Sequence, residues 1–444
     1  MHTIQSALDA LDAGETTSRA LTEACLARAA EGEGPRVFTA LLARQALAEA
    51  DAVDRRRAAG IDTGPLGGIP VSVKDLFDIA GLSTTAGSVV LADAPPASRD
   101  ALIVTRLRAA GAVIVGRTNM TEFAFSGLGL NPHYGTPANP WDRATGRIPG
   151  GSSSGAAVSV TDGMAIGAIG TDTGGSVRIP AALCGITGFK PTARRVPLDG
   201  SIPLSQTLDS IGPLARSVAC CRTLDAVLGG ESHRPVPRSV GDLRLAVPAT
   251  VVLEGLDADV TAAFAAARDR LAAAGAQIRE IAVPEFAETV EVARVATFAG
   301  VEAHAWHRDL LARDAARYDP RVALRITRGG QIAAADYVWL TGRRAELMAA
   351  MRARMEGVDA LLMPTVPVVA PPIALLETDE SAYLAANLLV LRNSTLVNFL
   401  DGCGLSLPCH APGAAPVGVT LARFDGRDGA LLDIGEAVER VLAG

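Results

Sequence analysis

Two serine-rich loops stand near each other in the sequence, and in each loop a serine directly follows a pair of glycines. Ser152 follows residues 150–151, and Ser176 follows residues 174–175. Because glycine adopts positive φ angles at little cost, the backbone of both loops can come close to a ligand. A serine hydroxyl becomes a useful nucleophile when a base removes its proton, so the two loops suit nucleophilic catalysis with a base nearby.

Lysine is the best candidate for this base. Of the 41 basic residues, only Lys74 and Lys190 are lysine, and the others are arginine, whose guanidinium does not deprotonate in proteins. Lys74 ends an apolar stretch, where burial would lower its pKa and favour the neutral amine. The alternatives are a structural ion pair between Lys74 and Asp75, or two lysines retained by accident. Lys190 belongs to no catalytic pattern, so Lys190→Arg is expected to have little effect.

The segments around these residues predict alternating strands and helices. Residues 65–74 form a short strand that would hold the Lys74 side chain on a rigid element. Residues 155–160 indicate a tightly packed helix and residues 165–170 a buried strand, since small and apolar side chains follow one another without charge. The two serine loops should therefore meet at one edge of a sheet. Residues 119–141 form a long loop rich in glycine, proline and aromatic residues, which is typical of a functional loop.

The rest of the chain predicts a larger α/β architecture. Residues 3–60 are rich in Ala, Leu, Arg and Glu and predict two or three helices, with Thr17 or Ser18 as a cap. Residues 301–356 are almost wholly helical and could cover the site. The other predicted elements are, in order, a helix over 101–110, a strand over 112–116, short strands and turns over 184–213, a helix over 214–229, a strand–helix–strand–helix series over 243–300, strands over 359–364, 404–409 and 417–421, and a closing helix over 428–442.

The sequence resembles the amidase signature family of serine hydrolases over most of its length. The densest matches are Gly-Ile-Pro-Val-Ser-Val-Lys-Asp at 68–75 and the segments 119–123, 134–141, 149–155, 170–180 and 209–213. The resemblance implies an α/β fold in which a large, mixed, twisted β-sheet is covered on both faces by α-helices.

The resemblance also implies a single domain over residues 1–444. The stretch 231–242, which contains two prolines, is the best internal boundary but does not need to separate domains. The expected subdivisions are N-terminal helices over 1–60, a catalytic core over 61–229, an α/β and helical cap region over 230–356, and C-terminal strands with a helix over 357–444 that rejoin the core.

The resemblance assigns a Ser-cisSer-Lys triad to three residues. Ser176 is the nucleophile, Ser152 the bridging serine and Lys74 the base, and the peptide bond between Gly151 and Ser152 is cis. Because a hydroxyl is both a donor and an acceptor, Ser152 could relay a proton between Lys74 and Ser176. The neighbouring serines at 153–154 are expected to cap a turn or a helix.

The loop that precedes the nucleophile could stabilise a negative charge. Thr173, Gly174 and Gly175 could aim successive backbone N–H groups at one point and form an oxyanion hole. A phosphate-binding nest is the competing interpretation, but neither loop has the Gly-Lys-Ser/Thr ending of a P-loop. Asp172 and Arg178 most simply form an ion pair that supports the loop.

The family places substrate contacts in the long loop that begins at residue 119. The positions that match these acyl-pocket contacts are Ala124, Phe125, Ser126 and Gly127. A packed loop without substrate contact is the alternative interpretation.

A second hydrolase interpretation uses Ser153. Residues 151–155 fit the G-x-S-x-G nucleophile elbow of α/β-hydrolases, which would make the chain an esterase with Ser153 as nucleophile. An elbow needs a buried strand directly before it, whereas residues 139–150 read as a loop. It also needs a downstream Asp and His, and the available histidines lie in no recognisable motif: His233, His304, His307 and His410.

Composition argues against several other functions. The net charge is −7 and the basic residues are scattered, so neither nucleic acid nor a membrane surface is indicated as a partner. The N-terminus lacks a signal-peptide pattern and no stretch reaches transmembrane length, so a cytoplasmic location is expected. The six cysteines lack a CxxC spacing and the histidines lack HExxH, so neither a metal nor another cofactor is expected. The oligomeric state stays open, with a homodimer as one alternative.

The resemblance implies a serine amidase, a hydrolase of C–N bonds that works through an acyl-enzyme intermediate. Relatives cleave amides, anilides, ureas, esters and carbamates, so urethanase and esterase activities are included. Because Arg178 is the one obvious basic residue of the catalytic loops, a small uncharged acyl group is expected. The presence of all three triad residues argues against a catalytically dead binding module.

The main alternative within the family is a glutaminyl-tRNA amidotransferase A-type subunit. Such a protein hydrolyses glutamine and passes ammonia to a partner subunit. Residues 191–200 read Pro-Thr-Ala-Arg-Arg-Val-Pro-Leu-Asp-Gly, which departs from the Tyr-Gly-Arg-Val-Ser pattern associated with that role. The sequence therefore favours a stand-alone amidase.

Overall fold

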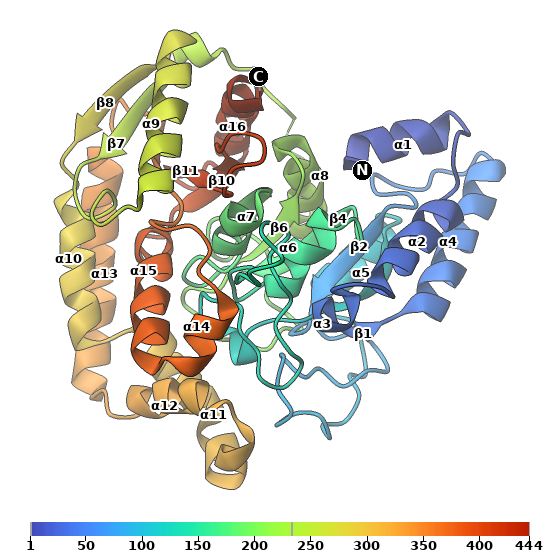
Figure 1. Ribbon diagram of the computed structural model, residues 1–444, viewed down its shortest axis with the longest axis horizontal. Helices are drawn as coiled ribbons and strands as arrows, with labels where there is room; N and C mark the ends of the chain where they lie inside the picture. Colours follow the sequence, from blue (N-terminus) through green and yellow to red (C-terminus); the bar gives the residue numbers. More distant parts are fainter. Residues whose placement is uncertain (1, 232–233, 444) are drawn as a thin grey trace.

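An eleven-stranded mixed sheet runs through the computed structural model, which describes residues 2–231 and 234–443. The strand order is β1-β3-β2-β4-β6-β5-β10-β11-β9-β7-β8, so strands from both ends of the chain join one sheet (Figure 1). The predicted α/β fold class, with one large mixed sheet between helices, is confirmed. The strands are β1 (Phe38–Leu41), β2 (Pro70–Lys74), β3 (Val113–Thr118), β4 (Gly167–Thr171), β5 (Thr187–Lys190), β6 (Ile211–Ala215), β7 (Arg244–Pro248), β8 (Gln277–Ile281), β9 (Ala360–Pro364), β10 (Cys403–Pro408) and β11 (Gly418–Arg423).

Helices flank the sheet along the whole chain. The α-helices are α1 (Ile4–Asp12), α2 (Ser18–Ala29), α3 (Gly34–Val37), α4 (Ala43–Ala58), α5 (Leu102–Ala109), α6 (Ser154–Thr161), α7 (Arg178–Cys184), α8 (Val218–Gly229), α9 (Ala258–Ala273), α10 (Pro284–Val295), α11 (Phe298–Asp314), α12 (Pro320–Gly329), α13 (Ala334–Arg354), α14 (Ile373–Thr378), α15 (Glu380–Phe399) and α16 (Asp428–Ala443). Short 3₁₀ turns are η1 (Glu122–Ala124), η2 (Val240–Asp242) and η3 (Ala315–Arg317).

The interior strand β2 carries Lys74 to the edge of the sheet at which the serine loops lie. All five residues of β2 are buried, as expected for a strand that is covered on both faces. β2 runs parallel to β4, which ends at Thr171. Because the carboxyl ends of parallel strands meet at the same edge of a sheet, Lys74 and Thr171 lie side by side. The predicted strand ending at Lys74 is confirmed.

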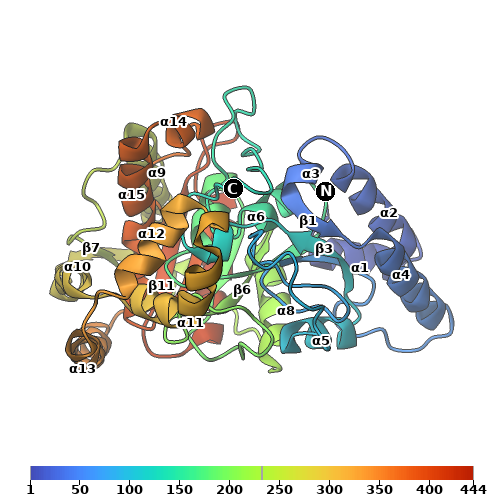
Figure 2. The ribbon, with the colours of Figure 1, turned by 90° about the horizontal axis from the view of Figure 1, so that it is seen from below.

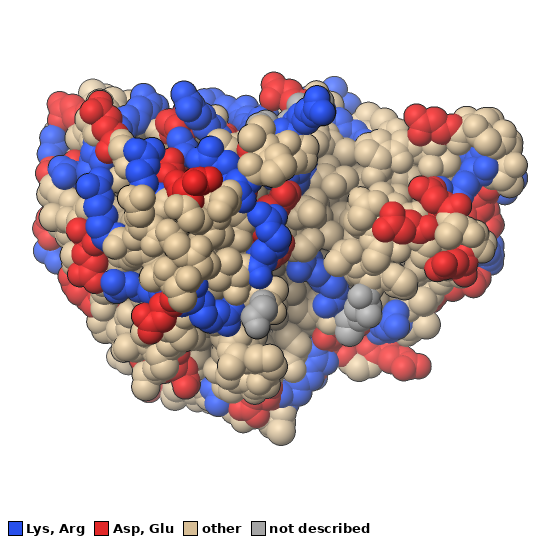
Figure 3. Space-filling model, turned by 90° about the horizontal axis from the view of Figure 1, so that it is seen from above, with Lys and Arg blue, Asp and Glu red and all other residues tan. Residues whose placement is uncertain are grey.

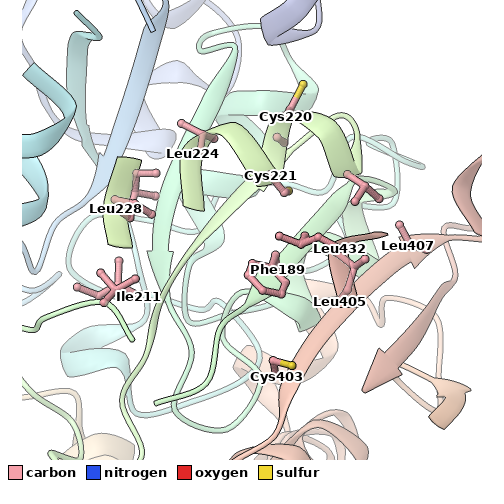
Figure 4. Packing of buried hydrophobic residues seen from close by; sticks show 14 of the residues in the cluster. Phe189, Ile211, Cys220, Cys221, Leu224, Leu228, Cys403, Leu405, Leu407 and Leu432 are labelled. Atoms are coloured by element: carbon pink, nitrogen blue, oxygen red, sulfur yellow. The ribbon is translucent and has the colours of Figure 1, made fainter. Parts of the chain in front are cut away.

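The two faces of the sheet bury separate apolar clusters. On one face α8 and α16 pack against β5, β6 and β10, where Phe189, Leu405 and Leu432 are in contact (Figure 4). On the other face α6 and α7 pack with α2 and α4. In β4, Ala168 belongs to the second cluster and Ile169 to the first, as the two-residue period of a strand requires.

Some predicted elements differ from the structure. The N-terminal region contains four helices and the edge strand β1 rather than two or three helices. The helix expected from residue 214 begins at Val218, because residues up to Ala215 belong to β6 and the Ser217 side chain caps the helix by accepting from Cys220 N. The long helix α15 was not expected from the sequence.

The boundary expected at 231–242 falls partly outside the described residues, since residues 232 and 233 are not described. His233, one of the histidines considered for the nucleophile elbow, also lies outside them. The described residues 234–239 have no regular structure, and the turn η2 follows. The subdivision of the chain at residues 60, 229 and 356 stays a prediction.

Helices α11 and α12 pack against each other at one end of the molecule. In Figure 1 they lie below α14 and α15, and in the view from below they lie in front of the sheet (Figure 2). This arrangement brings the predicted helical region 301–356 close to the segment that holds α15. The cavity described below lies between these helices and the serine loops.

The distribution of surface charge and the cysteine side chains say little about function. Basic and acidic side chains are interspersed over the face shown in Figure 3. Among residues 2–231 and 234–443, no helix combines the length and the apolar character that crossing a membrane requires. All six cysteines are buried and none forms a disulfide.

Candidate active site

Lys74 is fully buried, and its amine lies between two hydroxyl groups. Lys74 Nζ is 2.7 Å from Ser152 Oγ and 2.8 Å from Thr171 Oγ1. Thr171 is available for this contact because it ends β4 at the same sheet edge at which Lys74 ends β2. The sequence pointed to Lys74 and Ser152 but gave no role to Thr171.

The surroundings of Lys74 favour a neutral amine at moderate pH. Burial lowers the pKa of Lys74 from 10.5 to about 7, because a charged ammonium is poorly solvated inside the protein. The negative charges of Asp209 and Asp172 oppose this shift without cancelling it. Near pH 7 the amine can therefore both lose and accept a proton.

The loop that carries Ser152 is fixed by backbone contacts on both sides. The peptide bond between Gly151 and Ser152 is cis, and Gly150 adopts a φ of +76°. Thr121 N donates a hydrogen bond to Ser152 O at 3.1 Å, and Gly151 N donates to Gly127 O at 2.8 Å. The helix α6 then begins at residue 154, where the sequence predicted a helix of small residues.

Ser176 lies across from this loop and faces a cavity. Ser153 N donates a hydrogen bond to Ser176 O at 3.2 Å, so the two serine loops are in direct contact, as predicted. Ser176 is 3% exposed and lines the cavity. Within the described residues, the Ser176 hydroxyl makes no side-chain hydrogen bond, and none joins it to Ser152 Oγ. The structure thus brings Lys74 to Ser152 and places Ser176 on the neighbouring loop.

The turn before Ser176 needs glycine. Gly175 has a φ of +125°, a conformation that residues with a side chain rarely adopt. A Cβ atom at this position would lie 2.5 Å from the Cβ of Ser394 on α15. The close approach of α15 therefore depends on the absence of a side chain at residue 175.

Asp172 and Arg178 form a buried bidentate ion pair behind the loop. Arg178 Nε and Nη2 each lie 3.0 Å from a carboxylate oxygen of Asp172, and both side chains are fully buried. Although burial opposes it, the positive charge of Arg178 holds the pKa of Asp172 below its usual range. Arg178 Nη2 also donates to Ser394 O and Asn398 Oδ1, which ties the loop to α15.

The same carboxylate changes the expected oxyanion hole. Gly175 N donates to Asp172 Oδ1 at 2.8 Å, so this N–H group is already occupied, and the expectation for Gly175 needs correction. Within the described residues, the N–H groups of Thr173, Gly174 and Ser176 have no acceptor. These three groups are the ones free to face a developing negative charge.

A second carboxylate supports the loop from the other side. Thr173 Oγ1 donates to Asp209 Oδ1 at 2.5 Å, and the backbone N–H groups of Leu204 and Ser205 also donate to Asp209. Burial raises the pKa of Asp209 to about 6, although these hydrogen bonds and the charge of Lys74 act in the opposite direction. Asp209 belongs to the matched segment 209–213, but no role for it was predicted from the sequence.

The cavity beside Ser176 has a volume of about 400 Å³ and mostly apolar walls. Ala124, Phe125 and Ser126 form part of its lining, so three of the four expected pocket residues reach it. Gly127 instead lies behind the wall, where its N–H donates to Asn387 Oδ1 at 3.0 Å. The other lining residues come mainly from α10, the start of α11, α12 and α15.

Comparison with known proteins supports this assembly. A family model described as Amidase matches residues 20–432. The chain belongs to the amidase signature family. We therefore interpret the arrangement of Lys74, Ser152 and Ser176, with the cis peptide bond before Ser152, in terms of this family.

Individual relatives cover nearly the whole chain. A 2-amino-5-chloromuconic acid deaminase from Comamonas testosteroni is 38% identical over 439 residues, covering 96% of this chain and 93% of the relative. The A subunit of a glutamyl-tRNA(Gln) amidotransferase from Roseiflexus sp. is 37% identical over 475 residues, covering 99% and 96%. A crystal structure of an amidase superposes with a TM-score of 0.91 at 34% identity and covers 99% of this chain and all of the other.

The alternative elbow at Ser153 lacks its structural context. Within the described chain, an irregular segment and not a strand directly precedes Ser153, which lies at the start of α6. Its hydroxyl is buried and lies 3.4 Å from Thr171 O. In this amidase signature fold the Ser153 hydroxyl contacts the end of β4 and does not line the cavity.

Two residues of the cavity wall cannot be recognised from the sequence. Asn387 on α15 and Arg325 on α12 line the cavity, more than 140 residues after Ser176. Neither residue belongs to a local motif, and α15 itself was not predicted. Their contribution follows from how distant helices pack, which a single sequence does not display.

Proposed function

We propose that this amidase signature protein hydrolyses a C–N amide-type bond of a small-molecule substrate through Ser176, Ser152 and Lys74. The observation that carries the proposal is the buried Lys74 amine, with a pKa lowered to about 7, placed 2.7 Å from Ser152 Oγ beside the Ser176 loop. A base in this environment can accept a proton near neutral pH.

The proposed mechanism begins with proton transfer along the three residues. Neutral Lys74 takes the proton of Ser152, which takes the proton of Ser176 as the Ser176 oxygen attacks the substrate carbonyl carbon. Small rotations of the two serine side chains would join their hydroxyls, since catalytic hydrogen bonds often tighten only when substrate is bound. The proton then returns along the same path to the leaving nitrogen as the C–N bond breaks.

The negative charge on the substrate oxygen is stabilised by backbone donors. The free N–H groups of Thr173, Gly174 and Ser176 are proposed as the oxyanion hole, and each such donor contributes several kcal/mol, about 3, to the transition state. Asp172 and Arg178 hold the loop in place and take no part in proton transfer. Water then attacks the acyl-enzyme and releases the acid.

The substrate class is proposed from the family and the cavity. An amide, an anilide or a carbamate with a small acyl group suits the apolar walls, and ester cleavage is an expected side activity. The relative from Comamonas testosteroni is a deaminase of 2-amino-5-chloromuconic acid, so the leaving groups proposed here include ammonia as well as small amines. The expectation of an uncharged acyl group rested on the catalytic loops alone, whereas Arg325 and Arg328 reach the cavity from α12.

A second candidate function is that of a glutamyl-tRNA(Gln) amidotransferase A subunit, which would hydrolyse glutamine and pass ammonia to a partner subunit. These relatives are 34–37% identical and cover nearly all of this chain. Purified protein that hydrolyses a simple amide without a partner protein supports the stand-alone amidase. Glutamine hydrolysis that requires a second protein would support the other role.

Covalent labelling tests the catalytic assignment. After treatment with a fluorophosphonate, mass spectrometry should place the adduct on the peptide that contains Ser176. Ser152→Ala should lose most activity, remain folded and still label Ser176 slowly. An adduct on Ser153 would support the nucleophile elbow instead.

A further inference from the structure

A carboxylate on α11 accepts hydrogen bonds from two other parts of the chain. Glu302 Oε2 accepts from Ser205 Oγ at 2.5 Å and from Thr207 N at 3.0 Å. Glu302 Oε1 accepts from Thr207 Oγ1 and, at 2.8 Å, from Tyr337 Oη on α13. The Glu302 side chain therefore fastens the segment 204–209 to both α11 and α13.

The segment 204–209 is folded around a second carboxylate, that of Asp209. Asp209 Oδ2 accepts a hydrogen bond from Leu204 N at 3.0 Å, and both carboxylate oxygens lie 3.1 Å from Ser205 N. Asp209 Oδ1 also accepts from Thr173 Oγ1 at 2.5 Å. The same carboxylate thus closes the segment and holds the loop before the nucleophile.

Ser205 connects the two carboxylates. Its hydroxyl donates to Glu302, and its backbone N–H group faces Asp209. Ser205 is fully buried and Asp209 is 6% exposed, so close packing leaves these groups little room to shift. A continuous series of contacts therefore runs from Glu302 through Ser205 and Asp209 to Thr173.

Thr173 is the residue at which this series reaches the proposed oxyanion hole. Its backbone N–H group has no acceptor among the described residues, while its side chain is bonded to Asp209. The neighbouring residue Asp172 is bonded to the same stretch of chain, because Asp172 N donates to Ser210 O at 2.8 Å and Ser210 Oγ donates to Asp172 O at 2.8 Å. The place of the Thr173 N–H group thus depends on where residues 204–210 lie.

The segment also forms part of the cavity wall, which gives a second way for Glu302 to act. Leu204 and Leu208 line the cavity beside Ser176, whereas Glu302 does not. A change confined to this wall would weaken substrate binding and raise KM with kcat unchanged. Displacement of an oxyanion donor would instead lower kcat, because that donor acts mainly in the transition state.

We propose that Glu302 is a positioning residue for the oxyanion hole, which acts through Ser205 and Asp209 on the Thr173 N–H group. This inference rests on the proposed amidase function and its oxyanion donors. Such donors must be held within about 0.5 Å of the productive geometry by the residues behind them. Glu302 supplies this support from helices that follow the serine loops by more than 100 residues in the sequence.

Glu302→Ala tests the proposal by steady-state kinetics on an amide that the unmodified protein hydrolyses. We expect kcat to fall about 10- to 100-fold, since complete loss of one oxyanion donor costs about 100-fold or more, while KM changes less than about threefold. Ser205→Ala removes the hydroxyl contact to Glu302 but keeps the N–H group for Asp209, so it should lower kcat as well and serves if Glu302→Ala does not fold. A folded variant with unchanged kcat, or with a change in KM alone, overturns the proposal.

Glu302→Gln separates hydrogen bonding from a general structural effect. Its amide oxygen can accept from Thr207 N and Ser205 Oγ, and its NH₂ group can donate to the Tyr337 hydroxyl, which is also an acceptor. This variant should therefore keep kcat within about threefold of the unmodified protein. Glu291→Ala removes an exposed glutamate of α10 and is the control expected to leave kcat unchanged. A loss in Glu302→Gln as large as that in Glu302→Ala would contradict positioning through these hydrogen bonds.

A double-mutant cycle tests the route through Thr173. Thr173→Val removes the hydroxyl that donates to Asp209 but keeps the backbone N–H group. If Glu302 acts through this contact, the double variant should lose no more kcat than the more damaged single variant, because the two changes break one series of contacts. Losses that multiply would show that Glu302 acts independently of Thr173 and would overturn the proposal.

The outcome is distinguishable from failure of the proposed function. A fluorophosphonate that reacts at Ser176 also develops negative charge on an oxygen, so its labelling rate depends on the same donors. Labelling should be slowed about tenfold or more in Glu302→Ala and should stay unchanged in Glu291→Ala. Equal labelling of Ser176 in all three proteins would overturn the role of Glu302 and leave the catalytic assignment standing. If the unmodified protein does not label at Ser176, both proposals fail.

Discussion

The chemistry proposed for Lys74 depends on what its amine does not contact. Its two closest polar partners are the hydroxyls of Ser152 and Thr171, which can serve a neutral amine as well as an ammonium. The acidic groups that would stabilise the ammonium, Asp172 and Asp209, are engaged elsewhere, with Arg178 and Thr173 respectively. The lysine is thus buried with hydrogen bonds but without a salt bridge to a described residue.

Lys74→Arg tests the need for a deprotonated base. Arginine keeps the positive charge but stays protonated, so kcat/KM should fall at least about 100-fold, nearly as far as in Lys74→Ala. The measurement is steady-state kinetics on a simple amide, with circular dichroism to verify that each variant is folded. A folded Lys74→Arg protein that keeps more than about a tenth of the activity would exclude Lys74 as the base.

The pH profile should follow the ionisation of Lys74. Its pKa in the folded protein is lowered to about 7, so the amine is protonated and inactive at lower pH and neutral at higher pH. We therefore expect kcat/KM to rise with pH through an apparent ionisation near 7 and to reach a plateau. Because burial also raises the pKa of Asp209 to about 6, the measured value belongs to the coupled groups. A profile that is flat from pH 5 to 9 would argue against this base.

Lys190 shows why the rarity of a residue type is a weak guide to the effect of replacing it. The sequence suggested that Lys190→Arg would be tolerated, but Lys190 is 1% exposed, and its amine donates to Pro191 O and Gly402 O. The larger guanidinium would overpack this site, so Lys190→Arg should lower the free energy of unfolding by about 1–3 kcal/mol. Urea denaturation measures this loss, and an unchanged midpoint would show that the site can expand.

At the scale of elements, the site depends on three local features that meet. Parallel strands β2 and β4 bring Lys74 and Thr171 together, the loop before α6 places Ser152, and the turn before α7 places Ser176. Helix α15 holds the turn before α7 in place, because Arg178 Nη2 donates hydrogen bonds to Ser394 O and Asn398 Oδ1 on this helix. The catalytic turn is therefore held between the sheet and a distant helix.

Gly175→Ala tests how tightly this turn is confined. The φ of +125° disfavours alanine, and the added methyl would lie 2.5 Å from Ser394 Cβ. We expect a loss of about 1–3 kcal/mol in the free energy of unfolding and a roughly 100-fold or larger loss of kcat/KM, because the oxyanion donors would move. Gly413→Ala is a matched control, since Gly413 also has a positive φ, of +79°, but nothing lies within 4 Å of the added methyl. A Gly175→Ala protein that behaves like the control would show that the turn is adaptable.

The elements that the sequence predicted well are those with local signals. The strand ending at Lys74, the small-residue helix α6 and the strand–helix series from β7 to α10 all have apolar patterns that can be read over a few residues. Helix α15 has polar residues at buried positions, including Asn387 and Asn393, which obscure its periodicity. The cavity wall was missed for a different reason, because Arg325 and Asn387 acquire their role only through packing against Phe125 and Ser126.

At the scale of the whole molecule, the two halves of the chain are joined through one sheet and one site. β10 lies between β5 and β11, so the C-terminal strands continue the sheet that holds β2 and β4. The cavity likewise takes one wall from residues 124–126 and another from α12 and α15. Loss of the C-terminal half from the sheet would therefore remove part of the active site.

This arrangement predicts that unfolding is cooperative across both halves, although chains of this length often populate intermediates. Trp141 lies in the loop before Ser152, whereas Trp306 and Trp339 lie on α11 and α13, so the three tryptophans report on different regions. Variants that keep either Trp141 alone or Trp306 and Trp339 alone, with phenylalanine at the other positions, should show the same urea midpoint by fluorescence. That midpoint should also match the loss of helical circular dichroism and the loss of amidase activity. If the fluorescence of Trp306 and Trp339 changed at a clearly lower urea concentration while Trp141 stayed native, the C-terminal half would be an independent folding unit, and the shared sheet would not couple the two halves.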